Sequence, residues 1–152
     1  GGSEGQPSEA GFHEDVAAAL SFLRREGVVP DRIILYGESL GAGMAVMTAA
    51  RLAEAGTPVR ALILDSPYES IAAIAAELYW WVPVHWLMRD PFRADLAAPK
   101  VRAPVFAVHC REDWITPYDG ARRLIALLAG PTRLVTIDRR CHVPMLGGAG
   151  TE

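Results

Sequence analysis

The sequence predicts an α/β protein with a mainly parallel sheet, and three observations support this prediction. Short apolar runs of strand length alternate with longer segments of helical periodicity along the 152 residues, as in sheets with helical crossovers. The runs are apolar at consecutive positions, which favours strands covered by helices on each side. Hydrophobic residues make up 51% of the chain and charged residues 22%, which is typical of a globular domain.

The first part of the chain is expected to contain two helices and two strands. Residues 1–7 are rich in glycine and polar residues and predict a loop. Phe12, Val16 and Leu20 then recur at helical spacing, and Gly27 is a typical helix end. The further elements expected here are a strand over 32–36, a helix from the turn that follows to about 55, and a strand over 59–64.

The second part continues the alternation of helices and strands. A helix is expected over 71–79, followed by an apolar, tryptophan-rich segment and a polar loop. Thr116 and Pro117 predict a helix start, with threonine as the N-cap and proline at the first position. Two more strands are expected over 105–109 and 133–137, and the loop 138–142 follows the second of them.

A Gly-x-Ser-x-Gly motif, Gly37-Glu38-Ser39-Leu40-Gly41, lies between an expected strand and an expected helix. In that context the turn is sharp, and the serine sits in a strained backbone conformation with its hydroxyl exposed at the end of the sheet. Gly37 and Gly41 are expected to allow the strand and helix to approach closely. The helix N-terminus favours developing negative charge at the site. The alternative is a glycine-rich turn with an incidental serine.

A serine nucleophile needs a base and a third group that orients the base. In parallel sheets such groups gather at the carboxyl ends of strands. Asp113 follows the third expected strand and His142 follows the fourth. The order Ser39, Asp113, His142 is that of a known class of catalytic triad. Glu112 and Asp65 are kept as alternative acids.

Other polar residues near the strand ends receive structural interpretations. His109 ends a strand and is interpreted as a buried structural group. Ser66 lacks the turn motif and is interpreted as a helix-entry residue. Asp138 is assigned to the turn that leads to His142.

Several motifs along the chain resemble the α/β-hydrolase superfamily, more narrowly the bem46-like and serine-aminopeptidase-like hydrolases. The resemblance implies Ser39 as nucleophile, His142 as general base, Asp113 as its orienting partner and the Leu40 backbone N–H as half of the oxyanion hole. It implies no metal and no cofactor. The motifs are Gly2-Ser3-Glu4-Gly5, Gly37-Glu38-Ser39-Leu40-Gly41, Asp65-Ser66-Pro67-Tyr68, Arg102-Ala103-Pro104-Val105, the stretch 109–117 and Cys141-His142.

Compared with that family, the sequence lacks the first strands and the loop that supplies the second oxyanion donor. We therefore expect residues 1–152 to be a partial single domain, truncated at the N-terminus, with a cap-like insertion at about 69–98. We expect strand 33–36 to expose a sheet edge. The expected location is cytoplasmic or membrane-associated.

The segment 71–88 is apolar but interrupted by Glu77, Pro83 and His85, so it does not predict a membrane span. Three interpretations compete: a lid over the site, a membrane-surface patch, and core packing. The position of the segment favours the lid. Trp81, Trp86 and Leu87 are the expected substrate-binding residues of this lid.

The net charge of −3 and the absence of a basic run argue against a nucleic-acid partner. The two cysteines, Cys110 and Cys141, are expected to be free thiols, with a disulfide as the alternative. The sequence thus predicts a serine hydrolase of a small-molecule or acyl substrate, carboxylesterase-like. The alternatives are a serine peptidase and a non-catalytic binding or scaffolding module on the same fold.

Overall fold

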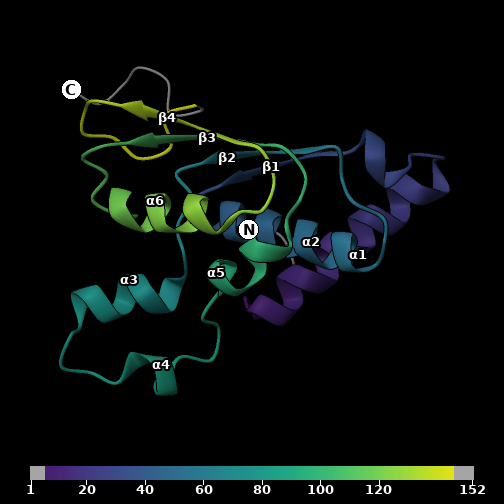
Figure 1. Cartoon of the computed structure of the whole chain (residues 1–152). Helices are drawn as coiled ribbons and strands as arrows, with labels where there is room; N and C mark the ends of the chain where they lie inside the picture. Colours follow the sequence, from purple (N-terminus) through teal and green to yellow (C-terminus); the bar gives the residue numbers. More distant parts are fainter. Residues whose placement is uncertain (1–5, 146–152) are drawn as a thin grey trace.

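The computed structural model of the chain describes residues 6–145, and four parallel strands form its sheet in the order β1-β2-β3-β4. This confirms the predicted α/β class and the parallel sheet. Because the strands are parallel, all four carboxyl ends lie at one edge, on the left of Figure 1. The strands are β1 (Ile34–Glu38), β2 (Ala61–Asp65), β3 (Val105–Cys110) and β4 (Thr132–Ile137).

The four predicted helices are present, with bounds that differ by a few residues from those expected. Two helices of four residues, α4 and α5, were not predicted, because one turn is too short to show helical periodicity. The helices are α1 (Glu9–Arg25), α2 (Leu40–Glu54), α3 (Ile71–Leu78), α4 (Val84–Leu87), α5 (Ala94–Ala97) and α6 (Tyr118–Leu127), with short 3-10 turns at Pro30–Arg32 and Ala98–Lys100.

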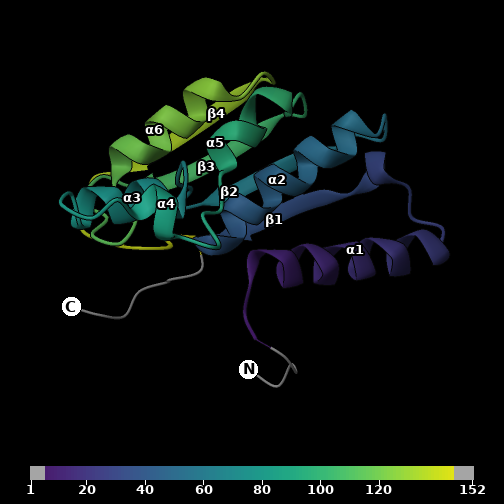
Figure 2. The same cartoon turned by 90° about the horizontal axis from the view of Figure 1, so that it is seen from below.

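The core lies between one face of the sheet and the helices that cover it. Helices α1, α2, α5 and α6 all lie on that face, as Figures 1 and 2 show together. Leu62 and Leu64 of β2 are fully buried there against Val46 of α2. Many of the other buried residues are alanines, whose small side chains let the helix backbones approach the sheet closely. This packing holds β1 and α2, and therefore the turn between them, in a fixed place.

Within residues 6–145, the opposite face of the sheet carries no helix. The expectation of helices on each side is therefore not met by the described part of the chain. Ile34 and Tyr36 of β1 are 52% and 45% exposed, and Phe106 of β3 is 37% exposed. β1 is also an edge strand of the four-stranded sheet, as expected for strand 33–36.

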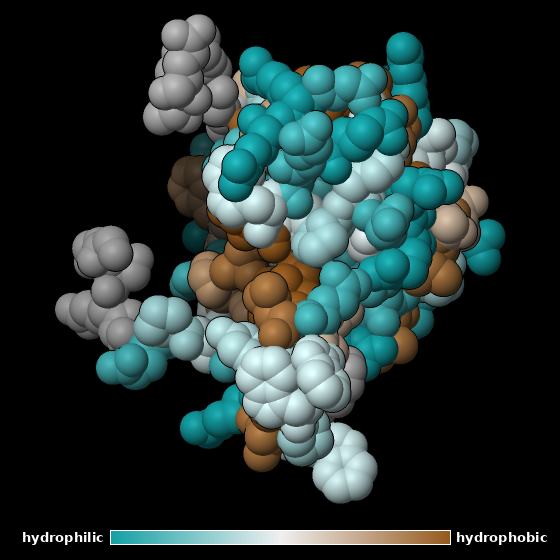
Figure 3. All heavy atoms as spheres, turned by 90° about the vertical axis from the view of Figure 1, so that its left-hand side faces the viewer, coloured by the Kyte–Doolittle hydropathy of each residue, from teal (hydrophilic) through white to brown (hydrophobic). Residues whose placement is uncertain are grey.

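The α3–α4 segment (residues 71–88) projects from the body at the lower left of Figure 1. Trp80, Trp81 and Trp86 are 81%, 65% and 91% exposed, so the core-packing interpretation of this segment was wrong. In Figure 3, which looks onto the left side of Figure 1, pale aromatic side chains project from the lower edge of the molecule.

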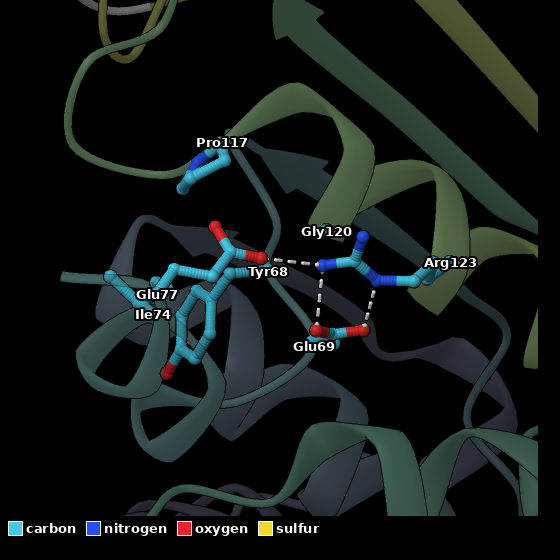
Figure 4. A pocket seen from close by; sticks show the side chains of 7 residues that line it. All are labelled: Tyr68, Glu69, Ile74, Glu77, Pro117, Gly120 and Arg123. Carbon is cyan, nitrogen blue, oxygen red and sulfur yellow. Dashed lines mark hydrogen bonds and ion pairs between the residues drawn. The ribbon is translucent and has the colours of Figure 1, made fainter. Parts of the chain in front are cut away.

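An arginine on α6 binds two glutamates, one just before the α3–α4 segment and one within α3. The guanidinium of Arg123 donates to both carboxylate oxygens of Glu69 at 2.7 and 2.8 Å and to Glu77 of α3 at 3.0 Å. Figure 4 shows the three side chains meeting beside Tyr68. Such paired hydrogen bonds orient a guanidinium more strictly than a single contact. They link α6 to α3 and to the residues just before α3.

Candidate active site

Ser39 lies in the sharp turn between β1 and α2, with a φ of 49°, in the left-handed region that few non-glycine residues adopt. This is the strained conformation that the motif predicted. A Cβ at Gly37 would collide with the Gly41 carbonyl and lie 2.7 Å from Cα of Ala42, so only glycine fits there. Gly41 itself faces open space among the described residues, so its expected role in close approach was wrong.

Tyr68 supports the helix that starts at the serine. Its side chain is 1% exposed, and its hydroxyl donates to the Leu40 carbonyl at 3.3 Å. Burial raises the pKa of Tyr68, so the phenol keeps the proton it donates. A Cβ at Gly43 would collide with the Tyr68 hydroxyl and lie 2.8 Å from Cζ, so Gly43 makes room for the ring. No local sequence pattern indicates this contact.

Asp113 lies in the loop after β3 and has an almost fully buried carboxylate. Its Oδ1 accepts from the backbone N–H groups of Ile115 and Thr116 at 2.8 and 2.9 Å, and its Oδ2 accepts from the Thr116 hydroxyl at 2.9 Å. Burial alone would raise the pKa of Asp113, but hydrogen bonds from His142 and this loop outweigh it and lower the pKa. The site thus holds a buried, ionised acid.

Thr116 does not cap the helix that follows, so its predicted role was wrong. Helix α6 begins at Tyr118 with Pro117 at the N-cap position. The Thr116 hydroxyl faces Asp113 instead. A hydrogen bond to an ionised carboxylate is stronger than one between neutral groups, so the hydroxyl binds Asp113 and not the helix end.

His142 joins the acid to the serine. Its Nδ1 lies 2.7 Å from Asp113 Oδ2, and its Nε2 lies 3.0 Å from Ser39 Oγ. In the neutral imidazole, an Nδ1–H donor to the carboxylate leaves Nε2 free to accept from the serine hydroxyl. The structure therefore brings together the three residues that the sequence singled out, from turns after β1, β3 and β4.

The alternative acids, Glu112 and Asp65, and the turn residue Asp138 have other surroundings than Asp113. Glu112 is exposed on the surface, and Asp138 forms an exposed ion pair with Arg111. Asp65 is buried at the end of β2, where its Oδ2 accepts from the Met145 backbone N–H at 2.8 Å.

His109 is a buried structural group, as interpreted from the sequence. Its Nε2 lies 2.9 Å from the Thr116 carbonyl and donates to it, which supports the loop that holds Asp113. Its side chain is 0% exposed, and burial lowers its pKa. The imidazole is therefore neutral at physiological pH.

Ser66 does not start a helix, so that interpretation was also wrong. Helix α3 begins at Ile71, and Ser70 is its N-cap, accepting from the Ala73 N–H at 3.0 Å. Ser66 is fully buried at the end of β2, and its hydroxyl accepts from the Val143 N–H at 3.0 Å. A serine after a buried strand gives no local signal of such a distant partner.

Cys110 and Cys141 form a disulfide, which corrects the expectation of free thiols. Cys110 ends β3, and Cys141 lies in the loop after the neighbouring strand β4. Their Cα atoms are 5.6 Å apart, within the range that a disulfide spans. The count of cysteines could not reveal this pairing, because only the sheet order brings the two residues together.

Reducing this disulfide is expected to lower the free energy of unfolding by roughly 3–4 kcal/mol, since it closes a loop with a sequence separation of 31. Urea unfolding with and without a dithiol reductant measures the change. The double variant Cys110→Ser/Cys141→Ser is the control and should not respond to reductant. Two titratable thiols in the unreduced folded protein would contradict the pairing.

The remaining predicted site residues lie around this centre. Leu40, the first residue of α2, directly follows Ser39, so its backbone N–H belongs to the helix N-terminus at the site. Trp81, Trp86 and Leu87 lie on the exposed α3–α4 segment, and Leu87 is 66% exposed. Their role in substrate binding stays a prediction.

Residues 6–145 contain no cluster of three or more His, Cys, Asp or Glu side chains able to hold a metal ion. The same residues include no helix with the length and apolar character needed to cross a membrane.

Comparisons with known proteins give matches across most of the chain. A family model described as alpha/beta hydrolase fold matches residues 10–106. Over 143 residues the chain is 38% identical to the uncharacterized protein Rv2307c of Mycobacterium tuberculosis, with 93% of this chain and 49% of that protein covered. It is 30% identical over 142 residues to the lysophosphatidylserine lipase ABHD12 of Danio rerio, with 85% and 37% covered.

Solved structures agree with these matches in fold. Est1E from Butyrivibrio proteoclasticus with bound ferulic acid superposes with a TM-score of 0.67 at 21% identity, and the match covers 90% of this chain and 63% of that one. The chain spans about half the length, or less, of the curated relatives it matches.

Proposed function

Since this chain belongs to the alpha/beta hydrolase fold family, we propose that it is a serine hydrolase that uses Ser39, His142 and Asp113 as its triad. The single observation that supports the proposal most strongly is the continuous contact from Asp113 Oδ2 through the imidazole of His142 to Ser39 Oγ. In the sequence, His142 is 29 positions from Asp113 and 103 positions from Ser39. The acid of this arrangement is ionised and buried.

In the proposed reaction, Ser39 Oγ attacks the substrate carbonyl carbon while His142 Nε2 takes its proton. The imidazolium that forms is stabilised by Asp113, which also keeps the ring in the required orientation. The oxyanion is stabilised by the Leu40 N–H and the N-terminus of α2. His142 then returns the proton to the leaving group, and water releases the acyl group from Ser39 by the same steps in reverse.

We propose a carboxylester as the substrate class. The exposed side chains of Trp81, Trp86 and Leu87 offer an apolar surface on which an acyl group could lie. They belong to the α3–α4 segment, which Arg123 of α6 contacts through Glu77 of α3. Tryptophan is also favoured at membrane–water interfaces, so the same surface suits a substrate presented by a lipid surface. The lipase among the relatives is consistent with this class.

A fluorophosphonate probe tests the proposal, because it forms a covalent adduct with an activated serine. We expect a single adduct, on Ser39, located by mass spectrometry of the digested protein. Ser66 and Ser70, which are buried serines with backbone N–H partners, serve as internal controls and should stay unmodified. No adduct on Ser39 together with a folded circular dichroism spectrum would favour the binding or scaffolding module.

The ester and peptide alternatives are separated by substrate. A carboxylesterase is expected to cleave p-nitrophenyl esters and to leave peptide anilides of equal acyl group essentially intact. A serine peptidase would cleave both kinds of substrate while giving the same Ser39 adduct.

A further inference from the structure

The loop that carries His142 is attached to the end of β2 by two side chains outside the triad. The Ser66 hydroxyl accepts from the Val143 N–H at 3.0 Å, and the Asp65 carboxylate accepts from the Met145 N–H at 2.8 Å. Both acceptor residues are 0% exposed. The two bonds join residues 77 and 80 positions apart in sequence.

The backbone conformations at this junction show that the contact is enforced. Ser66 has a φ of 50° and Val143 a φ of 56°, both in the left-handed region. A β-branched residue such as valine rarely adopts this conformation, and such strain persists only where the surroundings over-determine it. The hydrogen bond between these two strained residues is one such constraint.

The two hydrogen bonds lie directly beside His142, the proposed general base. Val143 directly follows His142, while Cys141 directly precedes it and is tied to Cys110. The backbone on either side of the histidine is therefore held at two neighbouring strand ends, β2 and β3. β2 is also tied to the nucleophile, because the Ser39 N–H donates to the Asp65 carbonyl at 2.9 Å.

We infer that Ser66 and Asp65 are positioning residues for His142, an inference that rests on the proposed function. The end of β2 then serves as a common support that sets the distance between Ser39 Oγ and His142 Nε2, which is 3.0 Å in the structure. A misplacement of about 1 Å between reacting groups can cost about a hundredfold in rate. The carboxylate of Asp65, considered above as an alternative acid, has this positioning role instead.

Ser66→Gly is the decisive variant, because glycine adopts a φ of 50° without strain and lacks the acceptor hydroxyl. We expect kcat for p-nitrophenyl acetate to fall about tenfold to a hundredfold, with KM changed less than threefold. A merely structural role would lower the unfolding midpoint and leave kcat of the folded protein unchanged. Deuterium uptake of the peptide containing Val143 should increase in this variant.

Ser8→Gly is the matched control. The Ser8 hydroxyl also accepts a backbone N–H, that of Gly11 at 3.1 Å, but at the start of α1 and outside the site. This variant should keep kcat within twofold. Asp65→Asn retains an oxygen that can accept from Met145 and should keep most of the activity, whereas Asp65→Ala should lose it as Ser66→Gly does.

The possible results separate this inference from the proposed function. Wild-type protein without fluorophosphonate labelling would refute the hydrolase proposal, while hydrogen exchange at Val143 would still report on the junction. Normal labelling and kcat in a folded Ser66→Gly variant, or unchanged deuterium uptake there, would overturn the positioning role.

Discussion

Replacing His142 by alanine is expected to lower kcat by about a millionfold, close to the loss from removing the serine itself. Without the imidazole, no described group is placed to accept the proton of Ser39, since Nε2 of His142 is the partner of that hydroxyl. The members of a triad act as a unit, so the loss exceeds what a single hydrogen bond contributes. Kinetics with p-nitrophenyl acetate and the rate of fluorophosphonate labelling should fall together.

His13→Ala is a suitable control for this variant. His13 lies on α1, away from the candidate triad, and its Nε2 is 4.0 Å from a carboxylate oxygen of Glu9. The change should leave kcat within twofold. Substantial activity in a folded His142→Ala variant would show that another group acts as the base.

Asp113→Asn is expected to lower kcat by about ten-thousandfold at neutral pH. The amide keeps the size of the carboxylate but loses its charge, so it neither stabilises the imidazolium nor requires the Nδ1–H tautomer of His142. Kinetics at several pH values should show the loss at every pH where the wild-type protein cleaves the substrate.

Glu112→Gln is the matched control for the acid. It removes a neighbouring carboxylate that is exposed on the surface, and we expect kcat to change less than twofold. The reverse result, with Glu112→Gln inactive and Asp113→Asn active, would move the acid to Glu112.

Asp113→Asn should also alter how the free energy of unfolding depends on pH. The pKa of Asp113 is lowered in the folded state, so the unfolded chain binds its proton more readily. The stability that this carboxylate contributes is therefore present above its unfolded pKa of about 4 and is lost as pH falls through the lower folded value. Urea unfolding at pH values from 6 down to 2 should show that Asp113→Asn lacks this part of the acid destabilisation.

Much of the site could be predicted from the sequence because its signals are local. The apolar runs and the glycines around Ser39 indicated strand, turn and helix within a few residues of one another. Asp113 and His142 could be selected because each directly follows an expected strand, and parallel strands end at one edge of a sheet. The structure places all three side chains in contact.

The contacts that the sequence did not reveal join residues that are far apart and have no pattern of their own. The sequence around Thr116 predicts a helix cap, but the Thr116 hydroxyl binds Asp113. Ser66 was predicted to be a helix-entry residue, but its hydroxyl accepts from the backbone N–H of Val143, 77 positions away. In each case local preference was overruled by a partner that only the folded chain supplies.

By itself, the sequence determined the class of the fold, the strained turn at Ser39 and the order of the three candidate catalytic residues, because periodicity and turn chemistry act between near neighbours. Only the tertiary structure decided the Cys110–Cys141 pairing, the attachment of the histidine loop to β2 and the exposure of the α3–α4 segment. These depend on which strands lie side by side, and the energy of such long-range contacts is absent from any short stretch of sequence.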